Sequence, residues 1–141
     1  MSFLLDTNVV SEWVKPRPDA NVAAWLAGVD EDRVFLSVVS FAEIRHGIEL
    51  LGAGRRRDSL TRWLAEELPA RFDGRILPID RVIAEAWGVI VVRGRKRGAT
   101  LNSMDALLAA TAQVYGLTLV SRNRKDFEAS AVPLLNPWEE D

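Results

Sequence analysis

Short runs of apolar residues alternate along this chain with longer segments in which apolar residues recur every three or four positions. A short apolar run between polar residues is typical of a buried strand, and the longer period is typical of an amphipathic helix. Strands are therefore predicted at residues 3–5, 33–38, 75–79, 117–121 and 132–135. Helices are predicted at residues 8–14, 19–28, 40–51, 56–68, 80–91 and 103–115.

The order of these elements predicts a single α/β domain over residues 1–141. Strands that alternate with helices call for a parallel sheet with helices on both of its faces. The first strand, at residues 3–5, is apolar throughout, which indicates burial on both faces. The last strand, at residues 132–135, is expected at an edge of the sheet.

Three helix boundaries are predicted from polar residues and proline. Ser40 and Glu43 match the capping box, in which a serine opens a helix and a glutamate three residues later reaches back to the serine amide. Ser103 is expected to cap the helix that follows it. Pro69 is expected to end the helix over residues 56–68.

Composition narrows the class of protein. The chain has 141 residues, of which 48% are hydrophobic, so it is long enough to bury a full core. It contains no cysteine, which excludes thiol nucleophiles and thiolate metal sites. Its net charge of -2 argues against sequence-blind binding to polyanions. We recognise no secretory leader and no apolar stretch of membrane length, and we expect a cytoplasmic protein without a membrane partner.

Four acidic residues stand at the ends of predicted elements. Asp6 follows the first strand, Glu43 lies near the start of the helix after the second strand, and Asp126 follows the fourth strand. The carboxyl ends of parallel strands and the following helix N-termini meet at one edge of a sheet, where ligands bind. Asp105 is an exception to this rule, because its helix precedes a strand.

Each acid also has a purely structural explanation. Asp6 can serve as a turn residue, together with Asn8. Glu43 can complete the capping box, and Asp105 suits the first turn of a helix because of the helix dipole. Asp126 can lie in a surface turn. Jointly, however, several carboxylates at one edge repel one another and raise their pKa values unless a cation is bound. Mg²⁺ or Mn²⁺, which prefers oxygen ligands, is the natural cation.

Four blocks of the sequence resemble the signatures of PIN-domain ribonucleases, particularly toxins of the VapC and FitB type from type II toxin–antitoxin systems. The resemblance covers nearly the whole chain, and the four blocks occur in the family's order. The blocks are Leu5-Asp6-Thr7-Asn8, Ser40-Phe41-Ala42-Glu43 with Gly47, Met104-Asp105-Ala106-Leu107-Leu108-Ala109-Ala110, and Ser121-Arg122-Asn123-Arg124-Lys125-Asp126-Phe127.

The resemblance implies a PIN-like domain with a short, mostly parallel central sheet flanked by helices. It also implies that Asp6, Glu43 and Asp105 are catalytic acids that bind Mg²⁺ or Mn²⁺. The fourth acidic position is filled either by Asn123, through its carbonyl oxygen, or by Asp126. Thr7 is expected to contact a phosphate or a metal-bound water.

The implied function is that of a metal-dependent endoribonuclease toxin, which hydrolyses RNA phosphodiester bonds. Its implied partners are the RNA substrate, a small antitoxin that inserts a segment into the acidic cleft, and a second copy in a homodimer. Two alternatives remain open. One is a catalytically inactive PIN-fold module that binds protein or RNA, and the other is a metal-dependent DNA nuclease.

Basic residues and one histidine complete the set of candidates. Arg95, Lys96 and Arg97 lie just upstream of Asp105, where they are expected to hold RNA phosphates, although a solvated helix end explains them too. His46 is the single histidine, which excludes a mechanism based on paired histidines. A structural role for His46 is favoured over a catalytic one.

Overall fold

The computed structural model describes residues 1–99 and 101–139. Within them, five strands form one sheet in the order β3-β2-β1-β4-β5, and all neighbouring pairs are parallel. The strands are β1 Phe3–Leu5, β2 Val34–Ser37, β3 Ile76–Leu77, β4 Thr118–Val120 and β5 Leu134–Leu135. The predicted α/β class and the edge position of the last strand are confirmed, and β1 is the central strand.

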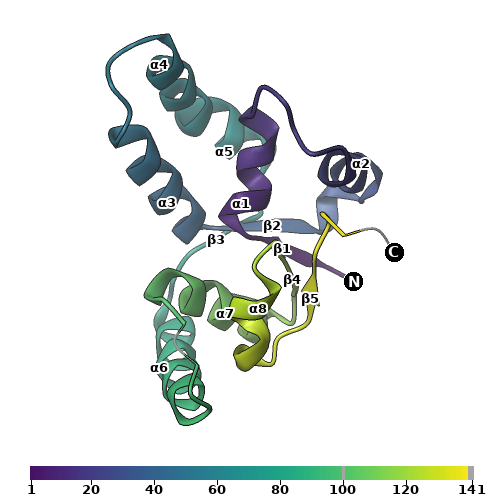
Figure 1. Cartoon of the computed structure of the whole chain (residues 1–141), viewed down its shortest axis with the longest axis vertical. Coiled ribbons are helices and arrows are strands. Elements are labelled where there is room, and N and C mark those ends of the chain that lie inside the picture. The colour runs from purple at the N-terminus through teal and green to yellow at the C-terminus, as the bar shows by residue number, and fades with distance from the viewer. Residues whose placement is uncertain (100, 140–141) are drawn as a thin grey trace.

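Helices cover both faces of the sheet, as Figure 1 shows. The layer formed by α1 to α5 lies on one side, and α6, α7 and α8 lie on the other. The helices are α1 Thr7–Val10, α2 Ala20–Gly28, α3 Val38–Glu49, α4 Arg55–Arg62, α5 Leu68–Arg71, α6 Arg81–Lys96, α7 Ser103–Tyr115 and α8 Arg124–Phe127. Among these described elements, none is long and apolar enough to cross a membrane.

The central strands are buried on both faces, as their unbroken apolar sequences predict. Successive side chains of a strand point to opposite faces of the sheet. Leu4 and Leu119 accordingly pack into the cluster that includes residues of α6, α7 and α8. Leu5 and Val120 pack into the second cluster, with residues of the α1–α5 layer. All four side chains are fully buried, so the sheet divides the core in two.

The strand register fixes the residues that follow β1 and β4. Leu5 pairs with Val120, and the amide of Asp6 donates to the carbonyl oxygen of Val120 at 2.9 Å. Asp6 and Ser121 therefore leave the sheet side by side, at the carboxyl edge of two neighbouring strands. This edge is where open α/β sheets bind their ligands.

Two of the predicted helix caps are wrong by a few residues. α3 begins at Val38, and its cap is Ser37, whose hydroxyl accepts a hydrogen bond from the amide of Val39. Ser37 is also the last residue of β2 and has extended backbone angles, which an N-cap requires, so strand and helix join without a loop. Ser40 therefore lies inside the helix, and it does not form a capping box with Glu43. α7 is capped by Asn102, one residue before the predicted Ser103.

The prediction that Pro69 ends a helix is also wrong. The helical segment that starts with α4 continues through a π-helical stretch at Trp63–Glu67 into α5, where Pro69 lies in the first turn. Proline has no amide to donate to a helix carbonyl group, so it fits best where the regular hydrogen-bond ladder is interrupted. The wider π-helical turn before it has relaxed the regular ladder of helix hydrogen bonds.

Candidate metal-binding site

Asp6 occupies the centre of the carboxyl edge and is 4% exposed. One carboxylate oxygen accepts from the amide of Thr7 at 2.7 Å and so caps α1, which confirms a local structural role. The other oxygen accepts from the hydroxyl of Ser121 at 2.7 Å. Burial raises the pKa of Asp6 above its usual value, the two hydrogen bonds oppose this, and the charges of Glu43 and Asp126 add to the increase.

Glu43 faces Asp6 from α3, where it is half-buried. The Thr7 hydroxyl donates to Glu43 Oε1 at 2.6 Å and lies 3.0 Å from the hydroxyl of Ser40. Ser40 is fully buried, so it fixes this arrangement from inside α3. The side chain of Thr7 therefore orients Glu43. The expected contact of Thr7 with a phosphate or a metal-bound water stays a prediction.

Asp105 lies in the first turn of α7 and is 9% exposed. Its pKa is raised to about 6, mainly by burial and further by the negative charges of Asp6, Glu43 and Asp126. A hydrogen bond from the Asn102 amide group partly offsets these effects. The four acids therefore share one electrostatic environment.

Asp105 lies near the other acids although its helix precedes a strand. α7 leads into β4 through a tight turn at Gly116, which adopts the left-handed conformation with φ 65°. A helix that joins a strand in this way runs antiparallel to it. Its first turn therefore lies at the carboxyl edge of the strand, beside Asp6.

Asn123 and Asp126, the two candidates for the fourth acidic position, are both exposed. Asp126 belongs to α8, and its charge raises the pKa values of both Asp6 and Asp105. The backbone amide of Asn123 donates to the Ser121 hydroxyl at 3.0 Å. This bond links the loop to Ser121, which itself donates to Asp6. Asp126 thus contributes negative charge to the site, and Asn123 anchors the loop that carries it.

Three neutral residues that hold the acids were not assigned such a role by the sequence analysis. Ser121 donates to Asp6, Asn102 donates to Asp105, and Ser40 lies beside Thr7, which donates to Glu43. A signal for the first two was present in the sequence. Ser121 is the last residue of the strand predicted at 117–121, at the carboxyl edge of the sheet, and Asn102 precedes Asp105 by three residues, the spacing of a helix cap.

The chemistry of the acidic cluster fits a divalent cation. None of the ion pairs among the described residues includes Asp6, Glu43, Asp105 or Asp126. No ion pair therefore compensates their negative charges, and these charges add to burial in raising the pKa values of Asp6 and Asp105. In the part of the chain that the structure describes, no three acidic or histidine side chains stand close enough together to hold one ion as placed. Coordination by three acids therefore requires side-chain rotations.

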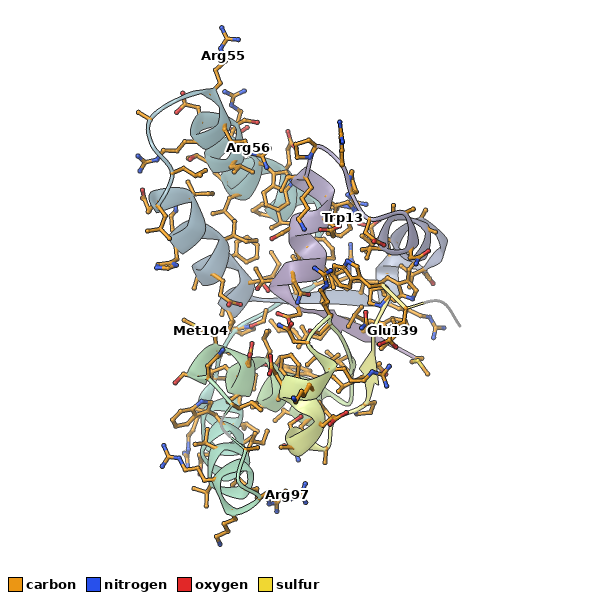
Figure 2. All side chains as sticks on the ribbon, in the orientation of Figure 1. Trp13, Arg55, Arg56, Arg97, Met104 and Glu139 are labelled. Carbon is orange, nitrogen blue, oxygen red and sulfur yellow. The ribbon has the colours of Figure 1, made fainter. Side chains whose placement is uncertain are left out.

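The predicted basic residues lie at the carboxyl-terminal end of α6. Arg95 and Lys96 form part of the last turn of α6, and Arg97 follows it, with a hydrogen bond of 3.4 Å to the carbonyl oxygen of Ala129. Figure 2 shows Arg97 at the outer tip of this layer and Met104, the residue before Asp105, close to the sheet.

Two other basic residues line a cavity together with Thr7 and Glu43. The cavity has a volume of about 350 Å³ and extends from Thr7 and Glu43 to Lys15 and Arg56. Between these ends it is lined mainly by apolar side chains of α3 and α4 and their neighbours. His46 is exposed in the last turn of α3 and is not among the residues that line this cavity.

Comparison with known proteins identifies the class of protein that this fold and site define. The family model described as PIN domain matches residues 3–132, and the chain therefore belongs to the PIN-domain family. Nucleases of this family in general depend on a metal ion, as the acidic site indicates.

Individual relatives cover almost the whole chain. Toxin FitB of Neisseria gonorrhoeae is 36% identical over 98% of this chain and 99% of its own length. VapC ribonuclease Y4jK of Sinorhizobium fredii is 33% identical over 97% of this chain and 98% of its own length.

Solved structures agree with this relationship. The crystal structure of FitAcB from Neisseria gonorrhoeae has a chain that is 36% identical, with a TM-score of 0.92 and coverage of 98% of this chain and 99% of that one. A toxin–antitoxin complex from Klebsiella pneumoniae has a chain that is 25% identical, with a TM-score of 0.71 and coverage of 99% and 100%.

Proposed function

We propose that this protein is a metal-dependent endoribonuclease and the toxin of a toxin–antitoxin pair, acting in the cytoplasm. The observation that carries the proposal is that Asp105 feels the negative charges of Asp6, Glu43 and Asp126, while no ion pair among the described residues includes any of these acids. The similarity to a VapC ribonuclease and to toxin FitB supports the same function.

The proposed metal ligands are Asp6, Glu43 and Asp105, with Asp126 or Asn123 at the fourth position. Their hard oxygen donors suit Mg²⁺ or Mn²⁺. When bound, such an ion polarises the scissile phosphate and lowers the pKa of a coordinated water. Ser121 and Thr7 fix Asp6 and Glu43 through neutral hydrogen bonds, which orient the carboxylates and leave their charge for the ion.

The proposal is tested by incubating the purified protein with RNA and with single-stranded DNA, with Mg²⁺ and with a chelator. We expect cleavage of RNA that requires Mg²⁺ and does not occur with the chelator. Cleavage of DNA alone decides for a DNA nuclease. Absence of cleavage of either polymer decides for an inactive binding module.

The antitoxin is proposed to occupy the cavity between α1, α3 and α4. This cavity is mainly apolar between the acidic Glu43 at one end and Lys15 and Arg56 at the other. An amphipathic segment of a small protein fits such a groove, because it buries apolar side chains and presents charges at both ends. The toxin–antitoxin complex among the similar structures supports an antitoxin as the partner.

The basic run Arg95, Lys96 and Arg97 is proposed to contribute RNA affinity and not chemistry. Replacing all three residues by Gln is expected to weaken RNA binding and to reduce its salt dependence, because phosphate contacts release counterions. Turnover at saturating RNA should be nearly unchanged. Binding measured at two salt concentrations tests this, and an unchanged salt slope would show that the run is only a solvated helix end.

A homodimer is proposed through the outer face of α6. Val82, Val89 and Val92 on this face are 59%, 49% and 49% exposed, which is unusual for an apolar stripe on one helix. Glu85 and Arg93 lie four residues before and after Val89. Two copies of α6 packed antiparallel about Val89 therefore place each Glu85 against Arg93 of the other copy.

Val89→Glu is expected to convert the dimer into a monomer, because it places two like charges at the symmetry axis. Ala84→Glu adds the same charge to an exposed position on another face of α6 and should leave the dimer intact. Sedimentation equilibrium of both variants and of the parent measures this. A parent protein that is monomeric, or a Val89 variant that remains dimeric, would rule out this interface.

A further inference from the structure

Asn102 makes two hydrogen bonds to a single residue, Asp105. Its Oδ1 accepts from the backbone amide of Asp105 at 2.8 Å, and its Nδ2 donates to Asp105 Oδ2 at 3.0 Å. Only one orientation of the amide group satisfies both bonds. Rotating it by half a turn would place NH₂ against the backbone N–H and the carbonyl oxygen against the carboxylate.

Capping explains only the first of these bonds. A helix cap needs a side-chain oxygen that accepts from an amide in the first turn. Asp80 caps α6 in this way, with its carboxylate accepting from the amide of Ile83 at 3.0 Å. The second bond requires a donor that reaches the carboxylate of Asp105. An aspartate cap has no such donor, and a serine cap has only a short hydroxyl group.

We infer that Asn102 is a positioning residue for Asp105 and orients its carboxylate for binding of the metal ion. This inference rests on the proposed metal-binding function. A neutral donor orients a carboxylate without neutralising it, whereas a lysine or arginine at this position would compete with the ion. The role matches that of Ser121 toward Asp6 and of Thr7 toward Glu43. Each buried or half-buried acid of the site is thus held by one neutral side chain.

Asn102→Ser separates the two bonds. Serine is as good a cap as asparagine, so α7 should keep its stability, but its single short hydroxyl group replaces the amide that reaches Asp105 Oδ2. Groups that hold a metal ligand typically change metal affinity by about 10–100-fold. We therefore expect Asn102→Ser to bind Mn²⁺ about tenfold more weakly, with an unchanged thermal unfolding temperature.

The matched control is Asp80→Ser, which exchanges one good cap for another on α6. It should bind Mn²⁺ like the parent. Asn102→Gly is a second test of the same position, because glycine also serves as a cap and removes the donor completely. In the Asp105→Asn background, replacing Asn102 should have no further effect on Mn²⁺ affinity, because the oriented ligand is already lost.

Calorimetric titration with Mn²⁺ of these full-length variants decides the question. Parent-like affinity in both the Ser and the Gly variants would show that Asn102 is only a cap. The same holds if Asn102→Ser weakens binding equally with and without the Asp105 carboxylate. Failure of the proposed function gives a different result, since the parent itself would then bind no Mn²⁺.

Discussion

Asp105→Asn is expected to abolish RNA cleavage and to relieve the growth arrest that follows induced expression of the parent protein. The substitution keeps the shape of the side chain and its place in the first turn of α7, but it removes the negative charge. Loss of a group that only supports a metal ligand typically lowers metal affinity or activity about 10–100-fold. Loss of a ligand itself should therefore lower activity by more than about 100-fold.

The measurement is the growth rate after induction, combined with RNA cleavage by the purified variant. Asp32→Asn is the matched control, because Asp32 is an exposed acid that precedes β2 and lies outside the site. It should be as toxic as the parent. A folded Asp105→Asn protein that still arrests growth would show that toxicity does not arise from the acidic site.

Without metal, Asp105→Asn is also expected to make the protein more stable at neutral pH. The pKa of Asp105 is raised to about 6 in the folded protein from an ordinary value of 3.8, because burial and the neighbouring acids disfavour its charged form. Above pH 6 the ionised carboxylate therefore lowers the free energy of unfolding by its full amount, which is the cost of this charge. The cost decreases as the pH falls through 6 and vanishes below the ordinary pKa.

The free energy of unfolding of Asp105→Asn should exceed that of the parent by on the order of 1–3 kcal/mol at pH 7.5. A tenfold change in a protonation equilibrium corresponds to about 1.4 kcal/mol. The difference between the two proteins should shrink as the pH is lowered to about 4.5. Urea unfolding at the two pH values, in the presence of a chelator, measures this difference. If the variant is less stable than the parent at pH 7.5, the carboxylate is not under electrostatic strain.

The order and class of the elements were predictable because they follow from local patterns. An unbroken apolar run such as Leu4–Leu5 is compatible with a strand buried on both faces, and β1 proves to be the central strand. Helix starts were less predictable, since several serines and asparagines compete as caps. Ser37 was assigned to β2 and not considered as a cap, yet it is both the end of that strand and the cap of α3.

The acids of the site were predictable as residue types at the ends of elements, but the side chains that donate hydrogen bonds to them were not. Sequence reasoning placed Asp6, Glu43 and Asp126 at one edge from topology alone. It did not show that Ser121 donates to Asp6 across 115 residues of sequence, because such a contact depends on the register of β1 against β4. It expected Arg95, Lys96 and Arg97 to hold RNA phosphates, and this stays a prediction.

The central claim is that the acids at the carboxyl edge hold a divalent metal ion. Calorimetric titration with Mn²⁺ of the parent protein and of Asp6→Asn tests it most directly. Asp6 is the most buried acid of the site and is oriented by two hydrogen bonds that a metal ligand can retain. We predict that the parent binds Mn²⁺ and that Asp6→Asn binds it much more weakly while remaining folded. Equal affinity of the two proteins would contradict this account.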